Sequence, residues 1–439
     1  MSADGTSASA APTAPWPAPR TAWTVVMVLS IASLFSFLDR TILGLLSQPI
    51  KTDLGLTDSQ LGLLQGAAFS IFYTLMIIPF GWVADRGNRM RMNFFGVIFW
   101  SLATAACGLS HSFAELFLAR ICVGFGEATL AASAASLIAD HFPQERRTMP
   151  LSVYTLVAST GVGFGLLGGG LLADLMAAGT VIALPGFGQL APWQAIFMAV
   201  GLPGVLWAMT LLMVREPVRR ETATETVTWG ELFAFIKLRR AIVLPHFIGY
   251  CFYNSFGYGG GGWIPTFFIR VHGWTVGEVG WRYGIPYLII PIIGGVVAGI
   301  IARRLLAAGR VDANLLTVAG GNLALAIPGV IAPLLSNQWL SLVGIMFVIA
   351  LFVFPSGPSL AAIQEITPNR LRCRMTAVYY AITNLVGLSF GSLFIGMLND
   401  YVFPEPTGVA KSLALAAGLL CPAGALIVYQ GARARRRLG

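Results

Sequence analysis

Residues 81–91 read Gly81-Trp-Val-Ala-Asp85-Arg86-Gly-Asn-Arg89-Met-Arg91, a short segment with four charges between two long apolar runs. The flanking runs cover roughly residues 58–84 and 91–110. A helix crosses the hydrocarbon core of a bilayer with about 20 mainly apolar residues, so each run is long enough to span a membrane. The segment is therefore expected to be the short charged loop between two membrane helices.

Composition places the rest of the chain in the membrane as well. Only 11 % of the 439 residues are charged, whereas a typical soluble domain has about a quarter. Hydrophobic residues make up 56 %, and the mean hydropathy is +0.75. A soluble fold of this size needs far more polar residues to cover its surface. This balance excludes a soluble enzyme and a nucleic-acid-binding protein, even though the net charge is +9.

The apolar runs predict an all-α integral membrane protein with twelve transmembrane helices, arranged as two pseudo-symmetric six-helix bundles. The predicted spans cover residues 22–48, 58–84, 91–110, 113–138, 149–176, 192–214, 241–268, 277–302, 312–334, 338–362, 375–399 and 408–430. The first bundle is expected over residues 21–214 and the second over 241–430. The linker between them, 215–240, mixes aromatic and basic residues in a way that is typical of an amphipathic helix at the membrane surface.

The basic residues predict the orientation. With twelve spans, 22 of the 28 Lys and Arg side chains fall on the side that carries both chain termini. The other side has only Lys51, Arg270, Arg282 and Lys411. Cytoplasmic loops are enriched in Lys and Arg, so both termini are predicted to be cytoplasmic, in a bacterial-type inner membrane. Residues 1–20 are then a disordered cytoplasmic tail and residues 431–439 a basic one.

A repeat relates the two bundles. Three glycines and one aspartate of the fifth span recur in the eleventh span at a constant offset of 226 residues. The pairs are Gly161 and Gly387, Gly165 and Gly391, Gly170 and Gly396, and Asp174 and Asp400. Internal repeats of this kind place the substrate site of a transporter between the halves, near the middle of the membrane.

The opening segment fits the pattern Gly-x-x-x-Asp-Arg-x-x-Arg and resembles the signature of the major facilitator superfamily. The resemblance implies that Gly81, Asp85, Arg86 and Arg89 form a cytoplasmic gate, in which Asp85 bridges to the cytoplasmic end of span 11 when the protein faces outward. The alternative is that the arginines only set the topology. The corresponding loop of the second half has Arg303 in place of the acid, so a symmetric second gate is not expected.

Within that superfamily, Phe37-Leu-Asp39-Arg40-Thr41 in span 1 resembles the spinster branch. Characterised members of that branch export lysophospholipids or sphingosine phosphate. An Asp-Arg pair in span 1 also occurs among organic-anion and sugar-acid carriers. The resemblance therefore implies a lipid-like substrate and leaves a sugar acid as an alternative.

Four ionisable residues lie deep in the predicted spans: Asp39, Arg40, Arg120 and Glu127. Such residues are costly inside a membrane and mark a substrate or ion pathway. We expect Asp39 to pair with Arg120, and Arg40 to reach Glu127. Protonation of either carboxylate would weaken its pair and couple protons to transport. The alternative is a static ionic brace between spans 1 and 4.

The second half has no charges at the equivalent positions and offers aromatic and amide side chains instead. The expected apolar wall consists of Tyr250, Tyr253, Asn254, Phe256, Tyr379, Tyr380 and Asn384. A cavity with one charged and one apolar wall suits an amphipathic anionic or zwitterionic solute.

Together these features predict a secondary active transporter that works by alternating access and is coupled to protons. The alternatives are a proton-driven multidrug efflux pump and an organic-anion or sugar-acid carrier. Four scattered histidines and five scattered cysteines give no metal-ligand spacing, so neither an enzyme nor a metal or cofactor is expected. Expected partners are the substrate, protons and membrane lipids but no nucleic acid, and the chain is expected to be a monomer.

Overall fold

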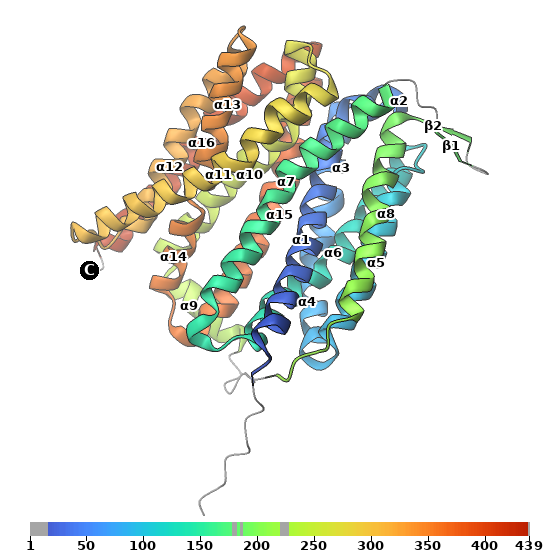
Figure 1. Cartoon of the computed structure of the whole chain (residues 1–439). Helices are drawn as coiled ribbons and strands as arrows, with labels where there is room; N and C mark the ends of the chain where they lie inside the picture. Colours follow the sequence, from blue (N-terminus) through green and yellow to red (C-terminus); the bar gives the residue numbers. More distant parts are fainter. Residues whose placement is uncertain (1–15, 178–181, 185–187, 220–227, 438–439) are drawn as a thin grey trace, which may run out of the picture.

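The structure, a computed structural model, describes residues 16–177, 182–184, 188–219 and 228–437 (Figure 1). Long helices run back and forth between two faces of the molecule. We call the face at which the first helix begins the terminal face, and the opposite one the distal face. The N-terminal half, α1 to α8, is blue to green in Figure 1, and the C-terminal half, α10 to α16, is yellow to red.

The N-terminal half consists of eight helices and a small hairpin. The helices are α1 (Pro19–Leu45), α2 (Ser47–Leu54), α3 (Asp58–Gln65), α4 (Ala67–Arg86), α5 (Arg89–Cys107), α6 (Phe113–His141), α7 (Thr148–Ala177) and α8 (Pro192–Leu212), with a 3-10 turn, η1, at Gln144–Arg146. Strands β1 (Ile182–Leu184) and β2 (Gly188–Leu190) pair antiparallel between α7 and α8.

The C-terminal half follows the short helix α9 (Trp229–Leu238). Its helices are α10 (Arg240–His272), α11 (Val276–Ala307), α12 (Ala313–Leu334), α13 (Gln338–Val353), α14 (Ser356–Ile366), α15 (Arg372–Met397) and α16 (Val409–Arg437). Short turns of helix, η2 (Asn369–Leu371), η3 (Leu398–Val402) and η4 (Pro406–Gly408), flank α15 and precede α16.

Eleven stretches of described helix are long and apolar enough to cross a membrane. The predicted seventh span corresponds to α10, which has 33 residues but is not one of the eleven. Glycines 259–262 and the tyrosines of α10 lower its hydropathy. The chain is therefore an all-α, multi-pass membrane protein, as the sequence predicts.

The structure corrects several predicted boundaries. Helix α1 begins at Pro19, so residues 19 and 20 are helical and do not belong to a tail. Residues 1–15, residues 220–227 of the linker and residues 438–439 lie outside the described part of the chain. Helix α16 continues to Arg437, so most of the predicted basic tail is helical. The predicted tenth span is divided into α13 and α14 at Phe354 and Pro355.

One terminal-face contact ties the end of α16 to the loop before α12. The carboxylate of Asp312 accepts hydrogen bonds from Arg310 (3.0 Å) and Arg436 (2.7 Å). Burial alone would raise the pKa of Asp312, but these hydrogen bonds outweigh it and lower the pKa below its usual value. The last helix of the chain is thereby fixed to the rest of its half.

The two halves meet mainly along two lines of contact. Helix α7 of the N-terminal half packs on α11, and α15 of the C-terminal half packs on α3 and α4. Because α7 and α15 carry the residues that repeat at an offset of 226, the two contacts are equivalent by internal symmetry. The charged residues of α1 and α6 lie in the N-terminal half beside this boundary.

Candidate functional site

An ion pair between α1 and α6 forms the centre of the site. Arg40 donates from Nε (2.8 Å) and Nη2 (2.5 Å) to one carboxylate oxygen of Glu127, Oε2. Ser36, one turn earlier in α1, donates to the same oxygen at 2.5 Å. The predicted contact between Arg40 and Glu127 is thus present, and all three hydrogen bonds converge on one oxygen.

Aromatic rings surround the Arg40 guanidinium. Its carbon Cζ lies 4.4 Å from the ring centre of Phe69, 4.7 Å from that of Tyr73 and 5.3 Å from that of Phe37. The Arg40 side chain is 23 % exposed, whereas that of Glu127 is 1 % exposed. Arg40 is therefore a cation that is held by rings and a carboxylate but keeps an open side. Phe69 and Tyr73 are not among the residues predicted from the sequence, although their four-residue spacing puts them on one face of α4.

Asp39 points to a different neighbour from the predicted one. It is 2 % exposed, and its Oδ2 accepts a hydrogen bond from Thr104 of α5 at 3.0 Å. No ion pair joins it to Arg120 in the described structure, so the predicted Asp39–Arg120 pair is wrong for this conformation. Arg120 is 1 % exposed, and its guanidinium lies 5.5 Å from the Phe69 ring. Adjacent residues of a helix point about 100° apart, which is why Asp39 faces α5 while Arg40 faces α6.

Several buried atoms of this group have no hydrogen-bond partner among the described residues. They are Oδ1 of Asp39, Nε and Nη1 of Arg120, and Oε1 of Glu127. Buried polar atoms are nearly always paired with protein or water, and an unpaired charge inside a protein is costly. The four charged residues are therefore not a fully satisfied static brace in this conformation, and their free atoms leave positions for water or a proton.

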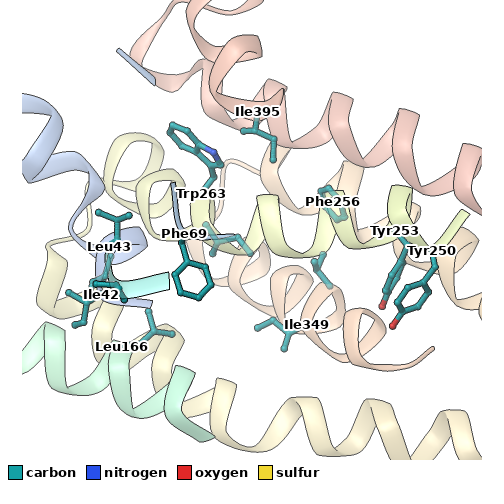
Figure 2. Close-up of a cluster of buried hydrophobic side chains, with 14 of the residues drawn as sticks. Ile42, Leu43, Phe69, Leu166, Tyr250, Tyr253, Phe256, Trp263, Ile349 and Ile395 are labelled. Carbon is teal, nitrogen blue, oxygen red and sulfur yellow. The ribbon is translucent and has the colours of Figure 1, made fainter. Parts of the chain in front are cut away.

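The predicted apolar wall is mostly buried in packing. Tyr250, Tyr253 and Phe256 lie along α10, and the two tyrosine hydroxyls point to the same side (Figure 2). Tyr250 packs on both Tyr253 and Tyr379, and the ring centres lie 5.4 Å apart in each pair. Asn254 is also buried, and its side chain donates to the carbonyl oxygen of Thr383.

Two tyrosines of α10 and α15 are exposed. Tyr380, a predicted wall residue, is exposed, and Asn384, one turn further along α15, is half-buried. Tyr258 of α10 is exposed as well and is not among the residues predicted from the sequence. The centre of its ring lies 5.2 Å from the centre of the Phe352 ring, and the two rings pack edge to face.

The buried tyrosines support the break between α13 and α14. The Tyr253 hydroxyl donates to the carbonyl oxygens of Leu351 (2.8 Å) and Phe352, which precede the break. His246 bonds through Nε2 to the carbonyl oxygen of Ser359 in α14 (3.1 Å), and the Ser359 hydroxyl contacts that of Tyr379. The Tyr253 hydroxyl therefore satisfies carbonyl oxygens at the end of α13, and the contacts of Ser359 link α14 to α10 and α15.

An apolar crevice lies behind the glycine-rich part of α10. Its lining includes Gly257, Gly261, Tyr283, Ile349 and Phe352. The free volume is about 30 Å³, which is room for about one water molecule. A Cβ atom on Gly257 would collide with the ring of Phe352, so α10 and α13 are in close contact there.

The charged residues of the predicted cytoplasmic gate have separate surroundings in this conformation. Arg89 is buried and forms ion pairs with Asp140 (2.7 Å) and Glu216 (2.7 Å), all within the N-terminal half or the segment that follows it. Asp85 and Arg86 are exposed, and the Arg86 guanidinium lies over the ring of Trp82 at 4.4 Å. In the described part of the chain Asp85 contacts no cation of the C-terminal half.

Gly81 lies one turn before Asp85, and no atom outside its own helix segment lies within 4 Å of the place a Cβ would take. A side chain is therefore sterically possible at this position in the present conformation. Among the described residues, no group of three or more His, Cys, Asp or Glu side chains is placed to hold a metal ion.

Comparison with known proteins identifies the family. Residues 29–392 match the model of the Major Facilitator Superfamily, which is more than half of the chain. The chain belongs to this superfamily. Its members and the similar solved structures are transporters, so the protein is an integral membrane transporter and not an enzyme.

Individual relatives match different lengths of this chain. An MFS-type efflux pump of Mycolicibacterium smegmatis is 29 % identical over 425 residues, which are 95 % of this chain and 94 % of the relative. Protein spinster homolog 1 of Homo sapiens is 32 % identical over 199 residues, 44 % of this chain and 35 % of the relative. A crystal structure of a bacterial homolog of the human lysosomal transporter spinster, inward-facing and unoccupied, superposes with a TM-score of 0.81 at 24 % identity, over 96 % of this chain and 98 % of that one. The resemblance to spinster proteins is thus confirmed.

Proposed function

We propose that this transporter is a secondary carrier that moves an amphipathic anionic or zwitterionic solute by alternating access, coupled to protons. One observation carries the proposal: Arg40 lies in the first membrane helix with an open side, although Glu127 and three aromatic rings hold it. A cation in the membrane interior is costly and marks a pathway for a charged species. The open side leaves room for a second anion beside Glu127.

The surroundings of Arg40 favour a solute with an apolar part. Phe69 and Tyr73 offer ring faces next to the guanidinium, and the C-terminal half contributes the exposed rings of Tyr258 and Tyr380. An anionic head on Arg40 would be followed by apolar contacts along these rings. The crevice beside Gly257 holds only about one water in this conformation, so an acyl chain would have to displace the Phe352 ring to enter it.

Asp39 is our candidate for the proton-carrying residue. Glu127 has the cation Arg40 as its direct partner, whereas Asp39 accepts one hydrogen bond from the neutral Thr104 hydroxyl. A protonated Asp39 avoids an unpaired buried charge. Loss of the proton would create a carboxylate with Arg120 as the nearby buried cation, and this pair would favour a different packing of α1 against α6.

We further propose that the terminal face is cytoplasmic. The support is the distribution of 22 of the 28 basic residues on that side. In the conformation that faces the other side, Asp85 and Arg86 would contact the start of α15 and close the terminal face. Their exposure in the present structure fits a conformation in which this contact is open.

The test is a transport screen in proteoliposomes with lysophospholipids, sphingoid phosphates and sugar acids. We expect saturable uptake of a lipid-like anion, lost in Arg40→Gln and kept in Arg91→Gln, since Arg91 is an exposed arginine outside both the site and the proposed gate. Saturable transport of sugar acids alone would refute the lipid-like substrate. Equal transport by Arg40→Gln and the parent would refute the role of Arg40.

A proton-driven efflux pump for lipophilic compounds is the second candidate. It is favoured by the similarity to the M. smegmatis efflux pump, which extends over nearly the whole chain. A pump of this kind would export uncharged or cationic dyes, and Arg40→Gln would not abolish that export. Dye efflux from cells that express the parent and Arg40→Gln distinguishes the two functions.

A further inference from the structure

A buried ion cluster joins the two halves at the distal face. Arg270, near the end of α10, donates from Nη1 (2.6 Å) and Nη2 (2.8 Å) to the two carboxylate oxygens of Asp58 at the start of α3. Its Nε also donates to Gln48 of α2 at 2.6 Å. Lys51 contacts Asp58 at 2.5 Å. Asp58 is only 2 % exposed, so one carboxylate of the N-terminal half is enclosed by cations from both halves.

A second carboxylate crosses the boundary in the opposite direction. Asp400, just after α15, accepts hydrogen bonds from the backbone N–H groups of Asp58 (3.0 Å) and Ser59 (2.7 Å). These N–H groups belong to the first turn of α3, where no helical acceptor exists and the helix dipole favours a negative charge. Asp400 therefore binds the C-terminal half to the same turn that carries Asp58.

Glycines bring the backbones together directly beside this cluster. A Cβ on Gly62 would lie 2.5 Å from the carbonyl oxygen of Ser392, and one on Gly396 would collide with the carbonyl oxygen of Asp58. We call this contact of α3 with α15 the first interface. It allows no side chain at these positions, so it is closed as tightly as two helices can be.

The contact of α7 with α11, the second interface, repeats the first one by internal symmetry. Thr57 and Thr275 both begin their helices with a capping box, and Gly62 corresponds to Gly280 at the same offset of 218 residues. A Cβ on Gly280 would lie 2.6 Å from the Cα of Gly170. The glycine contact is thus present in both interfaces.

The polar contacts are present in only one of them. Asp174, the counterpart of Asp400, lies with its carboxylate against Gly277 in the first turn of α11 but makes no hydrogen bond there in the described structure. The position of Asp58 is taken by Val276. Arg282 of α11 pairs with Glu278 of its own helix at 2.6 Å. The two interfaces match in shape but differ in hydrogen bonds and charge.

We propose that Asp58, Arg270 and Asp400 form the distal gate of this transporter, and that the polar contacts around the first turn of α3, which have no counterpart at the second interface, keep the distal face closed. The inference rests on the alternating-access function proposed above. In the conformation open at the distal face, Arg270 would leave Asp58, and Asp400 would leave the first turn of α3. The free energy of these contacts would then set the balance between the two conformations.

The test measures the conformation directly, without a substrate. Spin labels on His111→Cys and Ser336→Cys report the distal distance between the halves, and labels on Gln144→Cys and Ala308→Cys report the terminal one. All four positions lie in exposed loop or turn segments. The exposed Cys373 is replaced by Ser in every protein, and distances are recorded in lipid nanodiscs by pulsed electron spin resonance.

We expect Arg270→Gln and Asp400→Ala each to raise the ratio of distally open to distally closed molecules about tenfold, with the opposite change at the terminal face. Asp174→Asn is the matched control and should leave both distributions unchanged. The exchange of charges, Asp58→Arg with Arg270→Asp, should restore part of the closed population, and its melting curve shows whether the protein is folded.

Unchanged distances in both Arg270→Gln and Asp400→Ala would overturn the proposal. A shift in Asp174→Asn as large as that in Asp400→Ala would overturn the assignment to one interface. Because the distances need neither substrate nor a proton gradient, a shift without detectable transport would support the gate and count only against the proposed function.

Discussion

The replacement of Asp39 by Asn tests the proposed proton site most directly. The amide can still accept the hydrogen bond that Thr104 donates to Asp39 at 3.0 Å, so the packing of α1 against α5 is kept. What changes is the ability of residue 39 to gain and lose a proton. We therefore expect Asp39→Asn to fold like the parent and to lose the dependence of transport on the pH gradient.

The size of the effect follows from the coupling. A gradient of one pH unit stores about 1.4 kcal/mol per proton, which drives an accumulation of about tenfold for one proton per substrate. Asp39→Asn should reduce this to about onefold, which is equilibration across the membrane. Its stability should change by less than about 1 kcal/mol, the net value of one hydrogen bond. Asp39→Leu leaves the Thr104 hydroxyl unpaired and should cost about 1–3 kcal/mol.

The assay is uptake into proteoliposomes with and without a gradient of one pH unit, using the substrate from the screen. Glu127→Gln is the companion variant. It removes the anionic partner of Arg40 and should slow transport, but it leaves the titrating group at Asp39 and thus the response to the gradient. The reverse result, in which Asp39→Asn still accumulates substrate about tenfold and Glu127→Gln does not, would show that Glu127 carries the proton.

Three other variants test the described contacts. Arg89→Gln removes the cation that Asp140 and Glu216 share, a loss of about 3–5 kcal/mol for a buried pair, so the yield of folded protein should fall sharply while Arg86→Gln behaves like the parent in size-exclusion chromatography. Tyr253→Phe removes the donor to two carbonyl oxygens at the break in span 10. The free energy of unfolding should fall by about 1–3 kcal/mol, which would be seen as a lower melting temperature. An unchanged melting curve would mean that water replaces the hydroxyl. Two arginines lower the pKa of Asp312, so its ionised form stabilises the folded state above the unfolded pKa of about 3.9, and this contribution disappears as the pH falls below that value. The difference in melting temperature between the parent and Asp312→Asn should therefore be largest near neutral pH and shrink below about pH 4, and a difference that does not vary with pH would contradict the role of the charge.

The sequence predicts the long-range pattern of this protein well, because membrane spans and loop charges leave strong signals. The fold class follows from twelve apolar runs and a repeat at an offset of 226. The pairing of Arg40 with Glu127 can be predicted from their charges, because opposite charges attract each other strongly in the interior of a membrane. The second repeat, Thr57 with Gly62 and Thr275 with Gly280 at an offset of 218, is equally visible in the sequence but was not recognised there.

Other features depend on helix rotation and packing, which the sequence does not reveal. The spans of Asp39 and Arg120 are known, but their relative rotation decides whether the two side chains meet. Burial of Tyr253 likewise depends on the break between α13 and α14. Pro355 and Pro358 inside the predicted tenth span are a signal for that break, because proline removes a backbone hydrogen bond and distorts a helix.

The inequality of the two distal interfaces has a mechanical consequence. If both were equally strong, the halves would separate along the whole boundary at once. With the polar contacts concentrated around the first turn of α3, the contact of α7 with α11 offers less resistance and separates first. The distal face would then open in two stages, first between α7 and α11 and afterwards between α3 and α15, and the first opening to the central site would lie at the edge that faces the lipid. An amphipathic solute could pass there with its apolar part still in the bilayer.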